Sequence, residues 1–178
     1  MENQIESQTQ AQPNETTSLK ALFVKMAVDA WQTQNIRMNH LLEKLSDEEW
    51  QQQTAPGRNT GIYLLGHLTA VNDNLLVLFG FQEKLYPQLA KIFLDEPDQS
   101  GIEKPSLQEL KKYWTNVNAT LTEHMNKMHP DDWFTKHTAV SEADFAKEPH
   151  RNKLNVLMNR TTHQGYHLGQ LNYLVKKK

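Results

Sequence analysis

The stretch TTHQGYHLGQ, residues 161–170, places His163 and His167 four residues apart near the end of the chain. Side chains at positions i and i+4 of an α-helix lie one above the other, close enough to share a metal ion. Gln170 follows His167 by three residues and joins the same face. Val156 and Leu174 fall on this arc as well, so the pattern predicts a helix whose face is half apolar and half imidazole.

This helix is the last of four long helical patterns in the chain, which cover about residues 18–45, 60–80, 106–128 and 151–175. Ser18 is expected to cap the first helix, and Ser106 the third, with Glu109 completing a capping box. The third helix has the clearest apolar stripe: Leu107, Leu110, Trp114, Val117, Leu121, Met125 and Met128. Strand signals are weak throughout. The sequence therefore predicts an all-α four-helix bundle with long connections.

The first helix carries two sets of apolar residues. The set expected to face the core is Leu19, Leu22, Phe23, Met26, Ala30 and Leu41. Val24, Val28 and Trp31 lie outside that stripe, and we expect them to be exposed. An exposed second strip is typical of bundles that form dimers.

Two short segments suggest an internal repeat. KLSDEEW, residues 44–50, resembles KMHPDDW, residues 127–133. Each follows a long helix and precedes a loop and a helix that bears histidine. Ser46 and Glu49 have the spacing of a capping box at the first of them. The arrangement suggests two helical hairpins related by duplication.

Composition limits the classes of protein and of site. We expect residues 1–17, rich in Gln, Asn, Glu and Thr, to form a disordered tail, and residues 18–178 to form one domain. The 19 basic and 21 acidic residues are nearly balanced, so no nucleic-acid partner is expected. No apolar run would span a membrane and no signal peptide is visible, which predicts a cytoplasmic protein. Without cysteine, a metal would need His, Asp, Glu, Asn or Gln ligands.

A third histidine lies on the second helix. His67 is at the rim of that helix's apolar stripe, where an imidazole needs a partner for each ring nitrogen. One interpretation is a core histidine bonded to a neighbouring helix. The favoured interpretation is that His67, His163 and His167 bind a divalent metal ion and leave a position open. His40, on the first helix, is the rival candidate for a fourth ligand.

Other polar residues are candidates for supporting roles. Gln170 and Tyr166 are expected to orient a ligating imidazole, with ordinary packing as the alternative for Tyr166. Asn74, seven residues after His67, is expected to line the pocket. Asp29 and Asp73 are loosely placed candidates for a general base. The motif His-Glu-x-x-His of metalloproteases is absent, because Gln164 follows His163.

Residues 59–68, NTGIYLLGHL, together with HQGYHLGQ at residues 163–170, resemble the DinB-like family of metal-binding four-helix bundles. The resemblance covers about residues 18–175 and includes the turn SDEEW. It implies a divalent metal, often zinc or nickel, three histidine ligands matching His67, His163 and His167, and frequent homodimers. Leu168 stands where many members carry Arg.

The family includes thiol-dependent transferases for bacillithiol and mycothiol. Three neutral ligands leave the ion its full charge, so it can acidify a water or a thiol. Without an evident base, transfer of a low-molecular-weight thiol to a small-molecule substrate is favoured. The alternatives are a metal-dependent hydrolase and a non-catalytic, stress-related metal-binding bundle.

Overall fold

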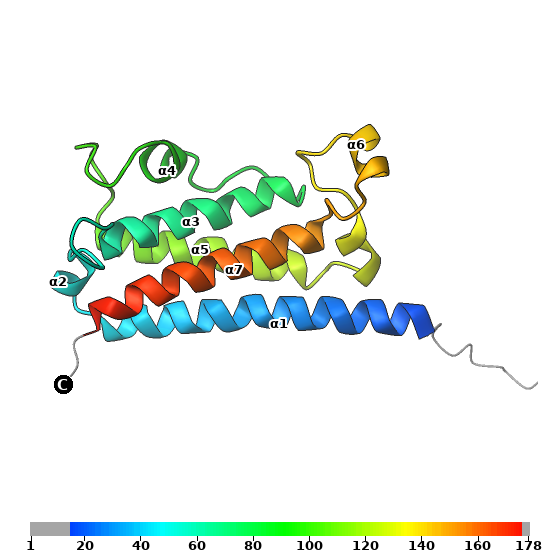
Figure 1. Ribbon diagram of the computed structural model, residues 1–178, viewed down its shortest axis with the longest axis horizontal. Helices are drawn as coiled ribbons and strands as arrows, with labels where there is room; N and C mark the ends of the chain where they lie inside the picture. The colour runs from blue at the N-terminus through cyan, green and yellow to red at the C-terminus, as the bar shows by residue number, and fades with distance from the viewer. Residues whose placement is uncertain (1–14, 176–178) are drawn as a thin grey trace, which may run out of the picture.

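The structure, a computed structural model, describes residues 15–175. Four long helices form the bundle (Figure 1): α1 (Glu15–Lys44), α3 (Gly61–Leu78), α5 (Leu107–Met125) and α7 (Lys153–Leu171). Shorter elements join them: α2 (Asp47–Trp50), α4 (Gln88–Ala90), the π-helix η1 (Lys91–Asp95), the 3₁₀-helix η2 (Pro130–Phe134), α6 (Glu142–Lys147) and the 3₁₀-helix η3 (Asn172–Leu174). No strand is present within residues 15–175, so the all-α prediction is confirmed.

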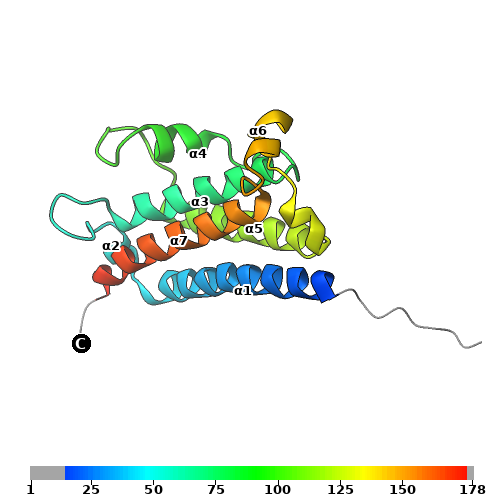
Figure 2. The same ribbon diagram turned by 45° about the vertical axis from the view of Figure 1, so that its right-hand side comes forward.

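The helices pack as α1 on α7, α7 on α3 and α3 on α5. Helices α3 and α5 run in the same direction, because Lys111 near the start of α5 approaches Asp47, before α3, whereas His124 near its end approaches Gln82, after α3. The long connection over residues 79–106 makes this crossover. It carries α4 and η1 along the outer side of α3, as Figures 1 and 2 show.

Two of the predicted helix caps are present and one is not. Ser46 and Ser106 each form a capping box, with Glu49 and Glu109 respectively. Ser18 is not a cap, because α1 already includes Glu15. The predicted tail lies outside the described residues from 1 to 14, whereas residues 15–17 belong to α1.

The predicted inner face of α1 is wrong over the first half of the helix. Leu19, Leu22, Phe23 and Met26 are exposed, by 47–64%. From Val24 onward the buried positions are three, four or seven residues apart: Val24, Trp31, Asn35, Met38, Leu41 and Leu45. The expected stripe is polar between Ala30 and Leu41, whereas the buried one stays mostly apolar to Leu45. An apolar face that continues along the helix buries more apolar surface than one that is interrupted by polar residues. The more continuous face of α1 is therefore the one that packs inward.

The residues expected to support dimerisation therefore change. Val24 is 8% exposed and Trp31 is 0% exposed, and Val28 packs against the same core. These side chains are not available to a second molecule. The exposed apolar strip of α1 instead consists of Leu19, Leu22, Phe23 and Met26.

The two halves of the chain share a sequence of elements. Trp50 lies in the capped turn of the first half, α2, and Trp133 in that of the second, η2, and both indoles are buried. In the second half His129 caps η2 with Asp132 as its partner. An antiparallel bridge then joins each loop to the N-cap of the next helix, Gln53 to Thr60 and Lys136 to Asn152. This correspondence supports the two-hairpin repeat.

A layer of amide side chains crosses the core, and each long helix contributes one: Asn35, Asn72, Asn118 and Gln164. Asn72 donates to Asn118 at 2.9 Å and lies 3.5 Å from Gln164 Oε1. Gln164 in turn donates to Asn35 at 2.9 Å. A connected buried network of this kind favours one alignment of the four helices, because any other would leave amides unpaired.

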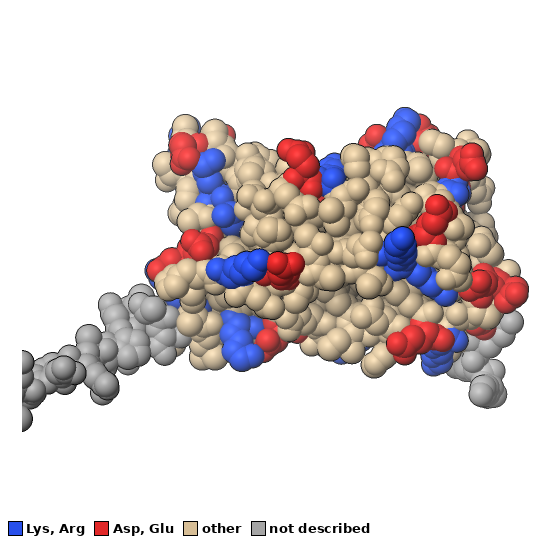
Figure 3. All heavy atoms as spheres, turned by 180° about the vertical axis from the view of Figure 1, so that it is seen from behind, with Lys and Arg blue, Asp and Glu red and all other residues tan. Residues whose placement is uncertain are grey.

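The face turned away from Figure 1 carries charges of both signs. Figure 3 shows Lys and Arg side chains interspersed with Asp and Glu, with no extended region of a single sign. Over the part of the chain that the structure describes, no helix combines the length and the apolar character needed to cross a membrane.

Candidate metal centre

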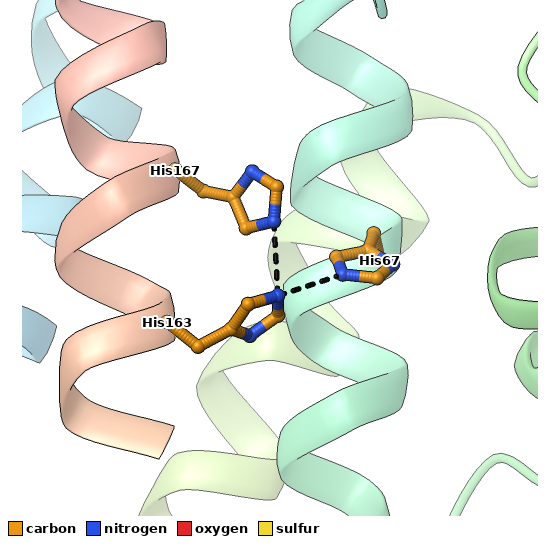
Figure 4. Close-up of side chains that lie close together, drawn as sticks. All are labelled: His67, His163 and His167. Carbon is orange, nitrogen blue, oxygen red and sulfur yellow. Dashed lines mark hydrogen bonds between the residues drawn. The ribbon is translucent and has the colours of Figure 1, made fainter. Parts of the chain in front are cut away.

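Three imidazole rings meet between α3 and α7. His67 projects from α3, and His163 and His167 project from α7 (Figure 4). Nε2 of His163 lies 3.2 Å from Nε2 of His67 and 3.0 Å from Nε2 of His167. All three rings are half-buried, and their ligating nitrogens lie within 4.8 Å of one another. Two sequence segments about a hundred residues apart thus present three nitrogens to one point.

A main-chain carbonyl fixes the tautomer of His67. Nδ1 of this ring lies 2.9 Å from the carbonyl oxygen of Phe93 in η1. A carbonyl oxygen can only accept, so Nδ1 carries the proton and Nε2 presents its lone pair. Metal-ligating histidines characteristically donate their other nitrogen to such a partner. Phe93 could not be identified from the sequence, because a main-chain acceptor in an irregular connection has no side-chain signature.

The close approach of Phe93 depends on Gly66. A Cβ atom at position 66 would lie 2.3 Å from the Phe93 ring, so only glycine leaves room for it. Tyr63, one turn before His67, donates its hydroxyl to the carbonyl of Glu96 at 2.8 Å and holds the end of η1. The π-helical turn is a feature often found at functional sites. Gly66, Tyr63 and η1 therefore position the acceptor for His67.

A side-chain oxygen accepts a hydrogen bond from Nδ1 of His167 and so fixes its tautomer. Nδ1 of His167 lies 2.7 Å from Oε1 of Gln170, which again leaves Nε2 free to bind a metal. Gln170 donates in turn to the hydroxyl of Tyr166 at 3.3 Å. Tyr166 is 64% exposed and stands at the outer edge of the site.

The three rings fit a cation better than they fit one another. Two lone pairs, from His67 and His167, point at Nε2 of His163, which can donate at most one proton. Nδ1 of His163 is buried and has no hydrogen-bond partner among the described residues. A divalent ion would accept all three lone pairs. In a tetrahedral site with zinc–nitrogen bonds of about 2.0–2.1 Å, two ligating nitrogens lie roughly 3.3 Å apart. The separations of 3.2 and 3.0 Å between the Nε2 atoms are close to that value. The donor set is therefore that of an open three-nitrogen site.

The surroundings keep the imidazoles neutral. Burial, with smaller contributions from the nearby His167, His67 and Arg160, lowers the pKa of His163 to about 4. Burial also lowers the pKa of His67 and the pKa of His167 from the usual value. Neutral imidazole is the form that binds metal.

The other sequence candidates lie elsewhere or take other roles. Asp73 accepts hydrogen bonds from the backbone amides of Leu85 and Tyr86, at 2.8 and 2.9 Å, and so anchors the long connection. Asp29 is exposed and pairs with Lys25. Neither carboxylate belongs to the three-histidine group.

His40 is exposed on α1, lining a groove of about 460 Å³ between α1 and α7, and it is not part of the group. Asn74 is half-buried and makes no hydrogen bond to the three histidines. Leu168 is 4% exposed and belongs to the core. Within residues 15–175 the three histidines are the only such group of potential metal ligands.

Comparisons with known proteins agree with this architecture. The chain matches the family model described as the DinB superfamily over residues 30–171. Among solved structures it is similar to a conserved protein from Enterococcus faecalis, with a TM-score of 0.58 and 13% sequence identity. That likeness covers 86% of this chain and 97% of the other and concerns the fold alone. No curated protein matches the chain in sequence.

Proposed function

The chain belongs to the DinB superfamily, and we propose that it is a metal-dependent enzyme that transfers a small thiol to a small electrophile. The observation that carries the proposal is the convergence of three neutral imidazole nitrogens, two of them oriented by hydrogen bonds at Nδ1. Zinc and nickel are the ions proposed for the site. Such a donor set suits either metal.

The residues around the site favour a thiol over water as the nucleophile. When bound there, a divalent ion would lower the pKa of a thiol or a water in its open position. Hydrolysis would additionally need a general base close to the attacking water. The two carboxylates that sequence suggested, Asp29 and Asp73, are engaged with Lys25 and with backbone amides. A thiol needs only to lose its proton to solvent before its sulfur replaces the leaving group on the electrophile.

The experiment compares metal-loaded and metal-free protein with a panel of small thiols and one fluorogenic electrophile, monobromobimane. Turnover that requires both a thiol and zinc or nickel, and that is lost in His163→Ala/His167→Ala, supports the proposal. A His150→Ala variant is the matched control, because His150 is an exposed residue before α7. Metal-dependent ester hydrolysis without thiol turnover would favour the hydrolase. Stoichiometric metal with neither activity would favour the non-catalytic bundle.

We also propose that the protein is a homodimer that pairs through the exposed apolar strip of α1. Leu19, Leu22, Phe23 and Met26 form this strip, and Met158 of α7, 44% exposed, extends it. A groove of about 290 Å³ lies between Phe23, Met26 and Met158. A two-fold contact would cover the same strip on both molecules at once.

A further inference from the structure

Arg160 stands beside the three histidines and takes no part in the site described so far. It lies three residues before His163 and seven before His167 on α7, so it starts from the same face of the helix. Its side chain is half-buried. Besides burial and other contacts, the charge of Arg160 contributes to the lowered pKa of His163 and of His67. The charge of Arg160 therefore acts on histidines of both α3 and α7.

No counter-ion accompanies this guanidinium. Among residues 15–175, Arg160 forms no ion pair, and its Nε is buried without a hydrogen-bond partner. Two other partly buried basic residues are paired: Arg151 lies 3.2 Å from Glu148, and Lys104 lies 3.0 Å from Asp98. Buried charged groups are normally paired, because desolvation without a partner is costly. An unpaired guanidinium with a shielded Nε is poised to accept an anionic ligand.

The charge balance of the site also favours an anionic ligand. Three neutral imidazoles cancel none of the charge of a divalent ion, and Arg160 adds a further positive charge. No carboxylate belongs to the histidine group to offset them. The summed field at the site, with a divalent ion bound, would thus favour a ligand with negative charge beyond a single thiolate.

We propose that Arg160 binds a carboxylate of the thiol substrate, so that the site selects small thiols that carry an anionic group. The inference rests on the proposed function, because it places the sulfur of the same molecule at the open position of the metal centre. Arginine suits the role, since its planar fork pairs with both oxygens of a carboxylate. Arg160 binds and orients in this scheme and makes no bond to the reacting atoms.

The test measures thiol binding instead of turnover. Cobalt-loaded protein is titrated with 3-mercaptopropionate and with 3-mercaptopropan-1-ol, which differ only in carboxylate against hydroxymethyl. The sulfur-to-cobalt charge-transfer absorption reports binding. We expect wild-type protein to bind the carboxylate thiol about tenfold or more tightly, the ratio expected for a hydrogen bond to a charged group. Arg160→Gln should bring this ratio close to that of the cobalt ion alone, with little change for the alcohol.

Two further variants complete the comparison. Arg151→Gln is the matched control at the exposed pair before α7, and it should keep the wild-type ratio. Arg160→Met keeps an apolar stem in the half-buried position and should lose the preference as Arg160→Gln does. Cobalt content and circular dichroism establish that each variant retains the site and the fold.

The outcomes separate this inference from the proposed function. Equal affinity of wild-type protein for the two thiols overturns the role of Arg160 and leaves thiol binding intact. An unchanged ratio in folded, cobalt-loaded Arg160→Gln or Arg160→Met overturns it as well, because direct contact of the carboxylate with cobalt would then explain the preference. If neither thiol alters the cobalt spectrum, the proposed function fails, and the role of Arg160 fails with it.

Discussion

Nδ1 of His67 donates to the carbonyl oxygen of Phe93 across 2.9 Å, and this contact ties the long connection between α3 and α5 to the candidate metal centre. Phe93 itself is fully buried against Gly66. A change in the packing of the connection is therefore transmitted to the orientation of one imidazole.

Gly66→Ala should weaken metal binding although position 66 touches no metal ligand atom. The new Cβ would overlap the Phe93 ring and push η1, with its carbonyl, away from His67. We expect a loss of about 10- to 100-fold in metal affinity and of about 1–3 kcal/mol in the free energy of unfolding. Competition with a chromophoric chelator measures the first, and urea denaturation the second.

Gly169→Ala is the control for that variant. It is also a helical glycine, but a Cβ there meets nothing within 4 Å. Its metal affinity should equal that of the wild type. Equal affinity in Gly66→Ala too would contradict the positioning role of Phe93.

Gln170→Leu should also lower metal affinity, by about 10- to 100-fold, because His167 loses the acceptor for its Nδ1 proton. Tyr166→Phe removes only the hydroxyl that accepts from Gln170 at 3.3 Å, at an exposed position. We expect that variant to bind metal within about threefold of wild type, since an exposed hydrogen bond adds little. A Gln170→Leu protein with undiminished affinity would sink the idea that Gln170 orients His167.

Metal binding should release few protons at pH 6.5. A histidine with the ordinary pKa of about 6.5 would be half protonated there and would release about half a proton on binding. The pKa of His163 is lowered to about 4, mainly by burial, and the pKa of His67 and of His167 is lowered too. Calorimetric titration in buffers of different ionisation enthalpy counts the protons, and a release of about 1.5 per ion would refute the lowered values.

The same lowered pKa values set the pH dependence of stability of the metal-free protein. Between about pH 6.5 and the lower folded-state pKa, the unfolded chain binds more protons at these histidines than the folded chain does. The contribution of His163 to the free energy of unfolding should therefore fall as pH decreases from about 6.5 to about 4. Urea denaturation of wild type and His163→Gln at several pH values isolates it, and parallel curves for the two proteins would argue against it.

Asn72→Ala should destabilise the bundle more than an exposed substitution of the same kind. It removes the donor to Asn118 and leaves buried amide groups of the layer without partners. We expect a cost of about 1–3 kcal/mol in the free energy of unfolding. Asn159→Ala on the exposed face of α7 is the control and should cost less than about 0.5 kcal/mol. Equal losses of unfolding free energy in the two variants would show that the buried amide layer stabilises the bundle no more than an exposed amide does.

The proposed dimer predicts that a charge in the α1 strip changes the molecular mass in solution. Met26→Glu should shift the protein towards monomer at tens of micromolar, as measured by light scattering, because the charge would be buried between two molecules. Ile36→Glu, also exposed on α1 but outside the strip, should leave the mass unchanged. A wild-type protein that is already monomeric at this concentration would remove the proposal.

The sequence predicted the helices well because periodic apolar patterns are local, as the buried stripe of α5 from Leu107 to Met125 illustrates. The inward face of α1 was not predictable from its first half, where two strips compete. Packing of the full length, centred on Trp31, decides between them. Sequence spacing brought His163 and His167 together, yet Phe93 could be found only in the structure, because its contribution is a carbonyl. Arg160 was visible in the sequence, but its lack of a partner was not.

The two hairpins of the repeat share the same order of elements but carry different residues at corresponding positions. Counted from its N-cap Asn152, helix α7 places His163 and His167 at the eleventh and fifteenth positions. The corresponding positions after Thr60 in α3 hold Val71 and Leu75, which are 7% and 0% exposed. One copy of the hairpin thus places apolar side chains of the core at these positions, while the other places two imidazoles there. Divergence between two similar halves would be enough to produce such a centre, with no change of scaffold.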